Sequence, residues 1–119
     1  MSTLRVNTLQ NTSGVEVYTA KAWVNFNGTG TVAIRAAGNV SSITDNGTGD
    51  YTVNFTVAMT DINYSYTIGI GPIPGFPYIN SLTNNSVSAP TTSNFKFCVN
   101  NAANGAQIDE TYINIAVFR

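Results

Sequence analysis

The sequence predicts an all-β fold, an antiparallel β-sandwich or jelly-roll-like knob preceded by a short N-terminal arm. Val, Ile and Thr supply 37 of the 119 residues, and their β-branched side chains favour strands. The helix formers Leu, Glu and Lys number only three, two and two, whereas 16 Asn, ten Gly and four Pro supply turns. Hydrophobic residues make up 43% of the chain, which is enough for the core of one domain.

Two parts of the chain differ in their apolar content. Residues 1–20 have few apolar anchors, and we expect them to form either a small hairpin or an extended arm. Residues 21–119 carry regular alternation of apolar and polar side chains and are expected to form the knob domain. The strands expected before the first long turn cover 22–27, 31–36 and 40–44.

The strongest turn signal is the segment 45–50, where Asn46-Gly47 favours the positive φ that tight hairpin turns require. After it, apolar and polar side chains alternate from Tyr51 to Thr60 with a period of two, as in a half-buried strand. A second alternating run covers 64–71. The short link 61–63 predicts that these two strands pair as an antiparallel hairpin.

The second half of the knob is less regular. Three prolines within 71–78 remove backbone donors, so this stretch is expected to be a loop that carries aromatic side chains. Residues 80–93 are rich in Ser, Thr and Asn and are expected to be irregular, with at most one edge strand. A strand is expected over 95–99 and a loop over 100–107. The last strand, 111–118, is apolar on both faces, which indicates a central strand or one covered by a partner chain.

Composition excludes several functional classes. Charged residues make up 9% of the chain, against roughly 25% in average soluble proteins, and the net charge is −1, so no positive field attracts nucleic acid. The absence of His removes the common general base and every His-containing metal site. The single cysteine, Cys98, is expected to be partly buried and unreactive. A surface so poor in charge favours association into an oligomer.

The acidic residues do not form a catalytic pattern. A glycosidase needs two carboxylates across a cleft. Asp45 and Asp50 suit a turn instead, and the neighbours Asp109 and Glu110 point apart on an extended chain. Oxygen donors in 45–50 make calcium a minor alternative, but their spacing does not match an EF-hand. We therefore expect no enzyme activity, no cofactor and no metal centre; no apolar run is long enough for membrane insertion.

Aromatic side chains supply the candidate binding residues. Trp23 lies on the polar side of its strand, and Tyr112 and Phe118 lie on the last strand, which is apolar on both faces. We expect these three residues to pack in an oligomer interface, with stacking on a sugar as the alternative for Trp23. Phe76 and Tyr78 stand in the proline-rich loop, where they either cap the core or bind a ligand.

Several segments carry a resemblance to a known family. They are Trp23-Val-Asn-Phe26, the run 39–51 (NVSSITDNGTGDY) and Asn54-Phe55, together with the opening segment 3–14 and the closing segment 113–118. On these segments the chain resembles a module of tail-fibre-like and other structural proteins of bacteriophages that infect marine bacteria and cyanobacteria. The resemblance implies a virion protein, a homotrimeric β-rich knob. Because the N-terminal segment has no apolar run of signal-peptide length, we expect synthesis in the host cytoplasm.

Two functions remain open on this resemblance. One is a short tail fibre or fibre knob that attaches to a host-surface glycan or protein; the other is a capsid decoration or tail-assembly protein with a purely structural role. In both, the N-terminal arm would hold the knob to another virion protein through Leu4, Val6 and Leu9. The residues expected to contact a host receptor are Phe76, Tyr78, Asn80, Asn84 and Asn85.

Overall fold

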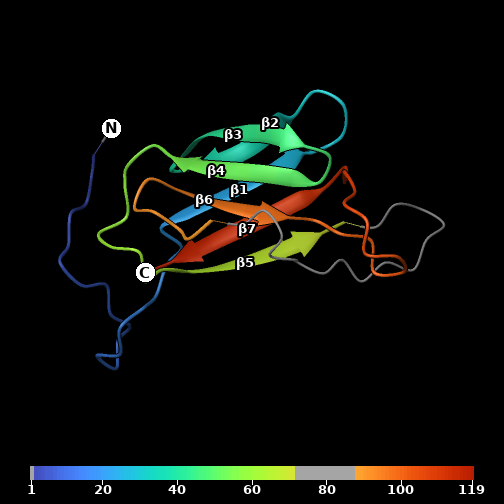
Figure 1. Cartoon of the computed structure of the whole chain (residues 1–119). Helices are drawn as coiled ribbons and strands as arrows, with labels where there is room; N and C mark the ends of the chain where they lie inside the picture. The colour runs from blue at the N-terminus through green and yellow to red at the C-terminus, as the bar shows by residue number, and fades with distance from the viewer. Residues whose placement is uncertain (1, 72–87) are drawn as a thin grey trace.

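A computed structural model describes residues 2–71 and 88–119 of the chain. These residues contain seven antiparallel strands (Figure 1). No helix occurs in these two ranges, so the prediction of an all-β chain is confirmed for them. The strands are β1 (Ala22–Asn27), β2 (Ala33–Gly38), β3 (Val40–Gly47), β4 (Asp50–Phe55), β5 (Ser65–Ile70), β6 (Asn94–Cys98) and β7 (Ile113–Phe118).

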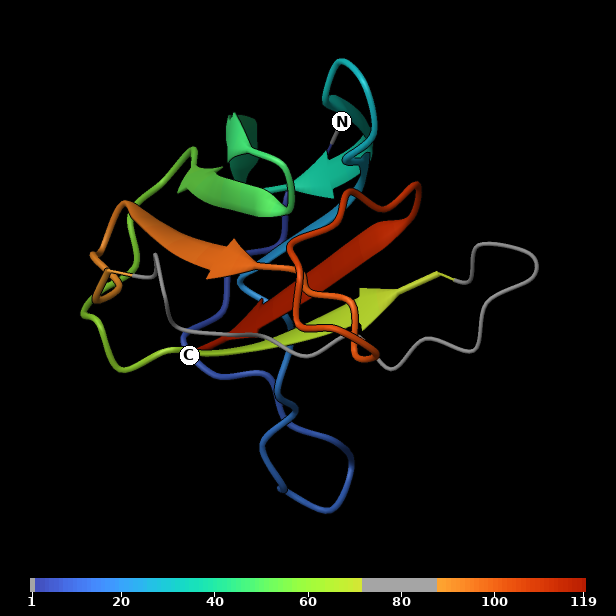
Figure 2. The same ribbon diagram turned by 45° about the vertical axis from the view of Figure 1, so that its right-hand side comes forward.

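The strands form two sheets that face each other as a sandwich (Figures 1 and 2). One sheet has four strands in the order β2-β1-β7-β5, and the other has three in the order β3-β4-β6. β7 lies between β1 and β5, with Val24 paired to Ile115 on one side and Ile68 paired to Ile115 on the other. The prediction of a central last strand is therefore confirmed.

Aromatic side chains fill the space between the sheets. Phe26 of β1 meets Tyr51 of β4 edge to face, with ring centroids 5.4 Å apart, and lies 6.4 Å from Phe97 of β6. Tyr66 of β5 stacks on Phe95 of β6 at 4.3 Å. Burial of each such ring stabilises the fold by about 1.5–3 kcal/mol, with further gain from the edge-to-face geometry. The alternation read from the sequence correctly identifies the inward side chains of β1 and β4, whereas in β7, apolar on both faces, the structure decides that Ile113, Ile115 and Val117 point inward.

The predicted hairpin of 51–60 with 64–71 is wrong. β4 pairs with β3 and β6, whereas β5 lies in the other sheet and pairs with β7. β4 ends at Phe55, and Val57 is 67% exposed. The link that follows therefore crosses between sheets instead of turning back within one. Alternation shows which side chains share a face, but it does not identify the neighbouring strand.

Asn39 explains where β4 stops. It adopts a left-handed backbone, with φ of 53°, at the one-residue corner where the chain passes from β2 to β3. Its Oδ1 accepts a hydrogen bond from Val57 N at 2.7 Å, and its Nδ2 donates to the carbonyls of Val57 and Lys21, both at 3.1 Å. The Asn39 side chain thus forms hydrogen bonds with the N–H and C=O groups of Val57, and these groups are no longer free to pair with a neighbouring strand.

Strand limits also differ from the predictions near the central turn. β2 begins at Ala33 and not at residue 31, and β3 extends to Gly47 and not to residue 44. The turn is centred on Thr48-Gly49, two residues beyond the predicted Asn46-Gly47. Gly49 has φ of 64°, and a Cβ there would lie 2.6 Å from Val99 O, which leaves room for glycine alone.

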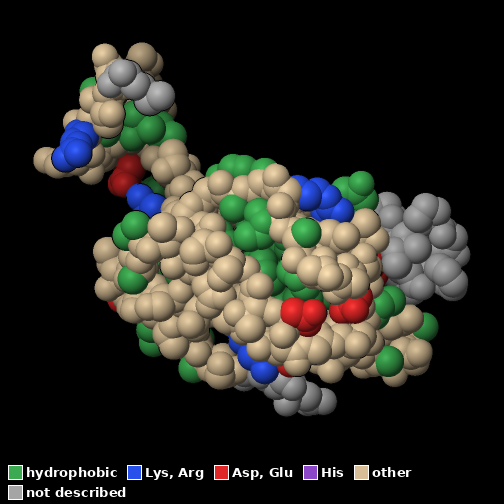
Figure 3. All heavy atoms as spheres, turned by 90° about the horizontal axis from the view of Figure 1, so that it is seen from above, with side chains coloured by type: hydrophobic (Ala, Val, Ile, Leu, Met, Phe, Trp, Pro, Cys, Tyr) green, Lys and Arg blue, Asp and Glu red, His purple; other side chains and the backbone are tan. Residues whose placement is uncertain are grey.

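The N-terminal arm combines both of the structures left open by the sequence. Residues 2–20 are exposed and leave the knob as an extended segment that carries a small hairpin, bridged between Gln10 and Glu16. Asn11 Oδ1 accepts from the backbone N–H groups of Ser13 and Val15 at its turn. The arm projects beyond the sandwich, so the molecule measures 48 × 28 × 28 Å (Figure 3).

Two glycine substitutions test the packing at the central turn. Gly49 and Gly105 both have positive φ, 64° and 71°, but a Cβ at Gly105 would meet nothing within 4 Å. We expect Gly105→Ala to destabilise the fold by about 1 kcal/mol through backbone strain alone. Gly49→Ala should cost about 3 kcal/mol or more, because the turn must also move away from Val99 and Ile108. Urea denaturation measures both; equal costs would contradict the close packing of Gly49.

Candidate functional site

The three aromatic residues predicted to form an interface lie on one surface, the outer face of the four-stranded sheet. Trp23 of β1 is 45% exposed, Phe118 of β7 is 39% exposed, and Tyr112, just before β7, is 49% exposed. Their neighbours in sequence, such as Ala22 and Val117, point into the core. The structure therefore places on one sheet face side chains that are about 90 residues apart in the sequence.

Small residues surround Trp23. In register across the sheet, Trp23 pairs with Gly38 of β2 on one side and with Ala116 of β7 on the other, and Ala116 pairs in turn with Thr67 of β5. A Cβ on Gly38 would lie 2.3 Å from Trp23 Nε1. The indole ring therefore lies directly over the backbone of Gly38, and this contact holds the ring on the sheet.

A polar network crosses the middle of the same face. Arg35 of β2 donates from Nη1 to Asn25 Oδ1 at 3.2 Å and from Nη2 to Thr111 O at 2.7 Å. Asn25 Nδ2 donates in turn to Asn114 Oδ1 on β7. The guanidinium carbon of Arg35 lies 4.1 Å from the centre of the Tyr112 ring, a cation–π contact. Arg35 is thus oriented by two hydrogen bonds and one aromatic face.

We call this set the outer-face cluster; its residues are Trp23, Asn25, Arg35, Tyr112, Asn114 and Phe118. None of the four strands of this sheet contains an acidic residue, so the charge of Arg35 is not balanced within these strands. Aromatic residues and Arg are the types most enriched in protein interfaces, and charged side chains other than Arg are depleted there. The residue types on this face are therefore those that protein interfaces favour.

Sequence reasoning missed Asn25, Arg35 and Asn114. The alternation of β1 and β7 places both asparagines on the outer face, which the sequence pattern could have shown. Their contact depends on the register between β1 and β7, where Asn25 pairs with Asn114. Arg35 lies where the register between β1 and β2 shifts, so neither its direction nor its neighbours follow from a period of two.

The acidic residues near the central turn hold loops in place. Asp109 Oδ1 accepts from the Tyr51 hydroxyl at 2.7 Å and from Gly49 N at 2.8 Å. Asp50 forms a salt bridge of 3.2 Å with Lys96 on the neighbouring strand β6, and Asp45 Oδ1 accepts from Gly47 N at 3.0 Å. These contacts agree with the structural roles expected for Asp45 and Asp50. In residues 2–71 and 88–119, no three His, Cys, Asp or Glu side chains are arranged to hold a metal ion.

Burial changes the ionisation of several groups in the core. The pKa of Tyr51 is raised well above its usual value, first by burial and then by the hydrogen bond to the Asp109 carboxylate. Burial also raises the pKa of Tyr64 to about 12. Cys98 is buried more fully than the partial burial expected, and burial together with the nearby Asp50 carboxylate raises its pKa, which keeps the thiol protonated.

Other predicted site residues do not join the outer-face cluster. The expected receptor-contact residues Phe76, Tyr78, Asn80, Asn84 and Asn85 lie outside the described residues. The expected attachment residues Leu4, Val6 and Leu9 lie on the arm and are 84%, 56% and 46% exposed.

No protein-family model, no curated protein and no solved structure matches the chain. Within the described residues, no helix is long and apolar enough to cross a membrane.

Gly38→Ala tests the packing of the Trp23 ring against the backbone of Gly38. The added methyl group would overlap the indole ring, so we expect the ring to swing away from the sheet into solvent. Trp23 is the only tryptophan of the chain, and its fluorescence therefore reports this movement alone. The emission maximum should shift to the red, and quenching by acrylamide should increase. Gly69→Ala is the matched control, because a Cβ there meets only Asn114 Cβ at an ordinary 3.8 Å. An unchanged spectrum in Gly38→Ala would contradict the placement of the ring.

Alkaline pH should destabilise the fold through its buried tyrosines. An unfolded tyrosine titrates near pH 10, whereas folded Tyr64 titrates near pH 12. Because the folded pKa is the higher one, this stabilisation is complete below about pH 10 and is lost as the pH rises from 10 to 12. Urea denaturation across this range should show the fall, and Tyr64→Phe should make it less steep. Tyr18→Phe, at a side chain 80% exposed, should leave the slope unchanged.

Proposed function

We propose that this chain is a non-catalytic building block of a bacteriophage particle, a homotrimeric fibre knob that attaches to the host surface. The outer-face cluster is the observation that supports this proposal most directly. It offers three partly exposed aromatic side chains and one oriented Arg on a sheet face with no acidic residue in its strands. In the trimer, this face packs against neighbouring copies.

The geometry of the cluster favours a protein interface. Trp23 and Arg35 are held by neighbouring groups before any partner arrives, so little side-chain freedom is lost on binding. The rings alternate with small residues such as Ala116 and Gly69, which lets another surface approach closely. Packing this face also removes apolar surface from a molecule in which only 9% of residues are charged.

A non-catalytic role agrees with the contacts of the reactive groups. Asp109 and Asp50 accept hydrogen bonds or ion pairs that hold loops and strands together. Cys98 is buried and its thiol stays protonated. The placement of the knob in a virion rests on the sequence resemblance, which covers β1, β3 and β4 most densely.

The second candidate is a capsid decoration or tail-assembly protein with no host contact. The same outer-face cluster supports it, because a face that packs between copies needs no receptor. The two candidates differ in where the protein lies on the particle and in whether its loss changes adsorption.

Paired substitutions test the interface. Trp23→Ser with Tyr112→Ser should dissociate the trimer, because truncating one interface hot spot typically costs about 2 kcal/mol, or about thirtyfold in affinity. Sedimentation at micromolar concentration measures the mass. Val57→Ser with Ile62→Ser removes comparably exposed apolar side chains, 67% and 52%, from the loop between β4 and β5. This control should remain trimeric. A monomeric wild-type protein, or equal effects of the two pairs, would contradict the interface.

Host attachment is tested on the particle. Labelling the chain in images of the virion should place it at the tip of a tail fibre, and the purified protein should compete with phage for adsorption. Phe76→Ala with Tyr78→Ala should weaken that competition. A position at capsid symmetry axes, together with unchanged adsorption when the protein is deleted, would favour the purely structural candidate.

A further inference from the structure

A small pocket lies at the end of the knob from which the N-terminal arm leaves. It has a volume of about 400 Å³, and its lining consists of Lys21, Asn39, residues 57–60 and Arg119. Lys21 directly precedes β1 and Arg119 directly follows β7, so the ends of two paired strands form one wall. Two of the five cationic residues of the chain line this pocket, and the described residues contribute no acidic side chain to its lining. We call it the cationic pocket.

Hydrogen bonds fix the backbone around the cationic pocket. Asn39 Nδ2 donates to the carbonyl oxygens of Lys21 and Val57, both at 3.1 Å, and Asn39 Oδ1 accepts from Val57 N at 2.7 Å. Met59 is buried, and its N–H donates to Thr92 O at 2.8 Å. These bonds are in place before any ligand arrives, so little chain freedom is lost when a ligand binds.

The two cations of the pocket differ in their partners. Asp61 accepts from Arg119 Nε at 2.8 Å and from Arg119 Nη2 at 2.5 Å, which orients the guanidinium group. The hydrogen bond to Arg119 lowers the pKa of Asp61 to about 2, so this pair stays ionised at neutral pH. Neither of the ion pairs in the described part of the chain includes Lys21. Arg119 therefore supplies oriented donors, and Lys21 supplies a positive charge that no ion pair balances.

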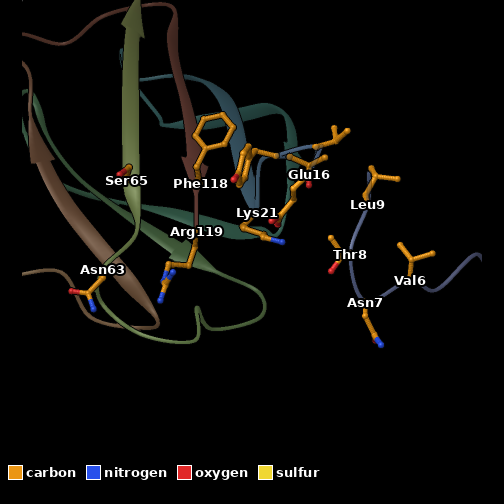
Figure 4. A pocket seen from close by; sticks show the side chains of 13 residues that line it. Val6, Asn7, Thr8, Leu9, Glu16, Lys21, Asn63, Ser65, Phe118 and Arg119 are labelled. Atoms are coloured by element: carbon orange, nitrogen blue, oxygen red, sulfur yellow. The ribbon is translucent and has the colours of Figure 1, made fainter. Parts of the chain in front are cut away.

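The arm of the same chain leaves the cationic pocket open. Lys21 and Arg119 also line a second cleft, of about 590 Å³, to which residues 6–9 of the arm contribute. Figure 4 shows both cations on the knob side of that cleft, near Phe118 and away from the arm residue Val6. The lining of the cationic pocket, in contrast, includes no residue of the arm. The arm therefore occupies the second cleft only, and a ligand can reach both cations from the cationic pocket.

The remaining side chains of the pocket indicate the kind of ligand. Val57, Ala58 and Met59 give the pocket an aliphatic wall next to the two cations. A Glu side chain matches both parts, because its methylene groups can pack on Val57 while its carboxylate accepts charge-assisted hydrogen bonds from Lys21 and Arg119. A sugar ring would find no aromatic side chain to stack on in this lining. The pocket therefore suits an acidic peptide better than an acidic glycan.

We propose that the cationic pocket binds an acidic side chain from an exposed acidic segment of another protein. The inference rests on the proposed function for the identity of that protein, which is the virion component that carries the knob. The position of the pocket supports this partner, because it lies where the arm leaves the knob. The arm then supplies apolar contacts through Leu4, Val6 and Leu9, and the pocket supplies a charged contact to the same protein. Charge complementarity of this kind speeds association and selects the partner.

Peptide binding to the full chain tests the pocket. The probe is a six-residue peptide of Ala and Val that contains two Glu residues, and its counterpart carries Gln in place of Glu. Backbone amide shifts of residues 57–60 in NMR spectra measure the affinity. We expect the Glu peptide to bind and its affinity to fall as the salt concentration rises, whereas the Gln peptide should bind about tenfold more weakly or less.

A matched pair of variants locates the binding charge. Lys21→Gln should weaken binding of the Glu peptide about tenfold. Arg5→Gln is the control, because it removes the same charge from an exposed residue that lines neither the cationic pocket nor the second cleft. It should leave the affinity close to the wild-type value. Both variants should stay folded, since Lys21 is exposed and takes part in the fold through its backbone N–H and C=O groups.

Several outcomes would overturn the inference. Equal binding of the Glu and Gln peptides, or equal losses in Lys21→Gln and Arg5→Gln, would show that the pocket does not select a carboxylate. Binding of D-glucuronate that Lys21→Gln weakens, without binding of the Glu peptide, would identify an acidic glycan as the ligand. Dissociation of the trimer by Lys21→Gln in sedimentation would show that the pocket packs between copies. A wild-type monomer that still binds the Glu peptide would contradict the proposed trimer and leave the pocket's selectivity intact.

Discussion

The hydroxyl group of Tyr51 ties together three segments that are distant in sequence. It donates to Asp109 Oδ1 at 2.7 Å and lies 3.0 Å from the carbonyl of Gly28, while the same Asp109 oxygen accepts from Gly49 N. Gly28 N also donates to Glu110 O at 2.8 Å. These bonds join the end of β1, the turn between β3 and β4, and the approach to β7. A buried network of this kind is costly to break, because each separated group would lose its partner away from water.

The position of this network determines the geometry of the outer face. By holding the end of β1 beside the approach to β7, it supports the register in which Asn25 pairs with Asn114 and Trp23 with Ala116. The aromatic core also supports the alignment of these strands, since Tyr51 packs against Phe26 of β1 and Phe97 of β6. One residue thus contributes both to the core and to the alignment of the strands that carry the proposed interface.

The proposed contact between copies depends on preorganisation. The outer-face cluster is a surface on a rigid sheet, where rings and an Arg are held by glycines and hydrogen bonds. These side chains therefore lose little freedom when a partner surface packs on them.

The sequence by itself determined the all-β class, the inward side chains of β1 and β4 and the outward position of Trp23, and it left the last strand open between a central place and one covered by a partner chain. Those conclusions follow from composition and from a period of two, which are local properties of an extended chain. The tertiary structure decided that β4 and β5 lie in different sheets, that Asn39 stops β4 at Phe55, and that Arg35 and Asn114 join the cluster. These features depend on register and on hydrogen bonds between segments far apart in sequence, and alternation along one strand carries no information about which strand lies beside it.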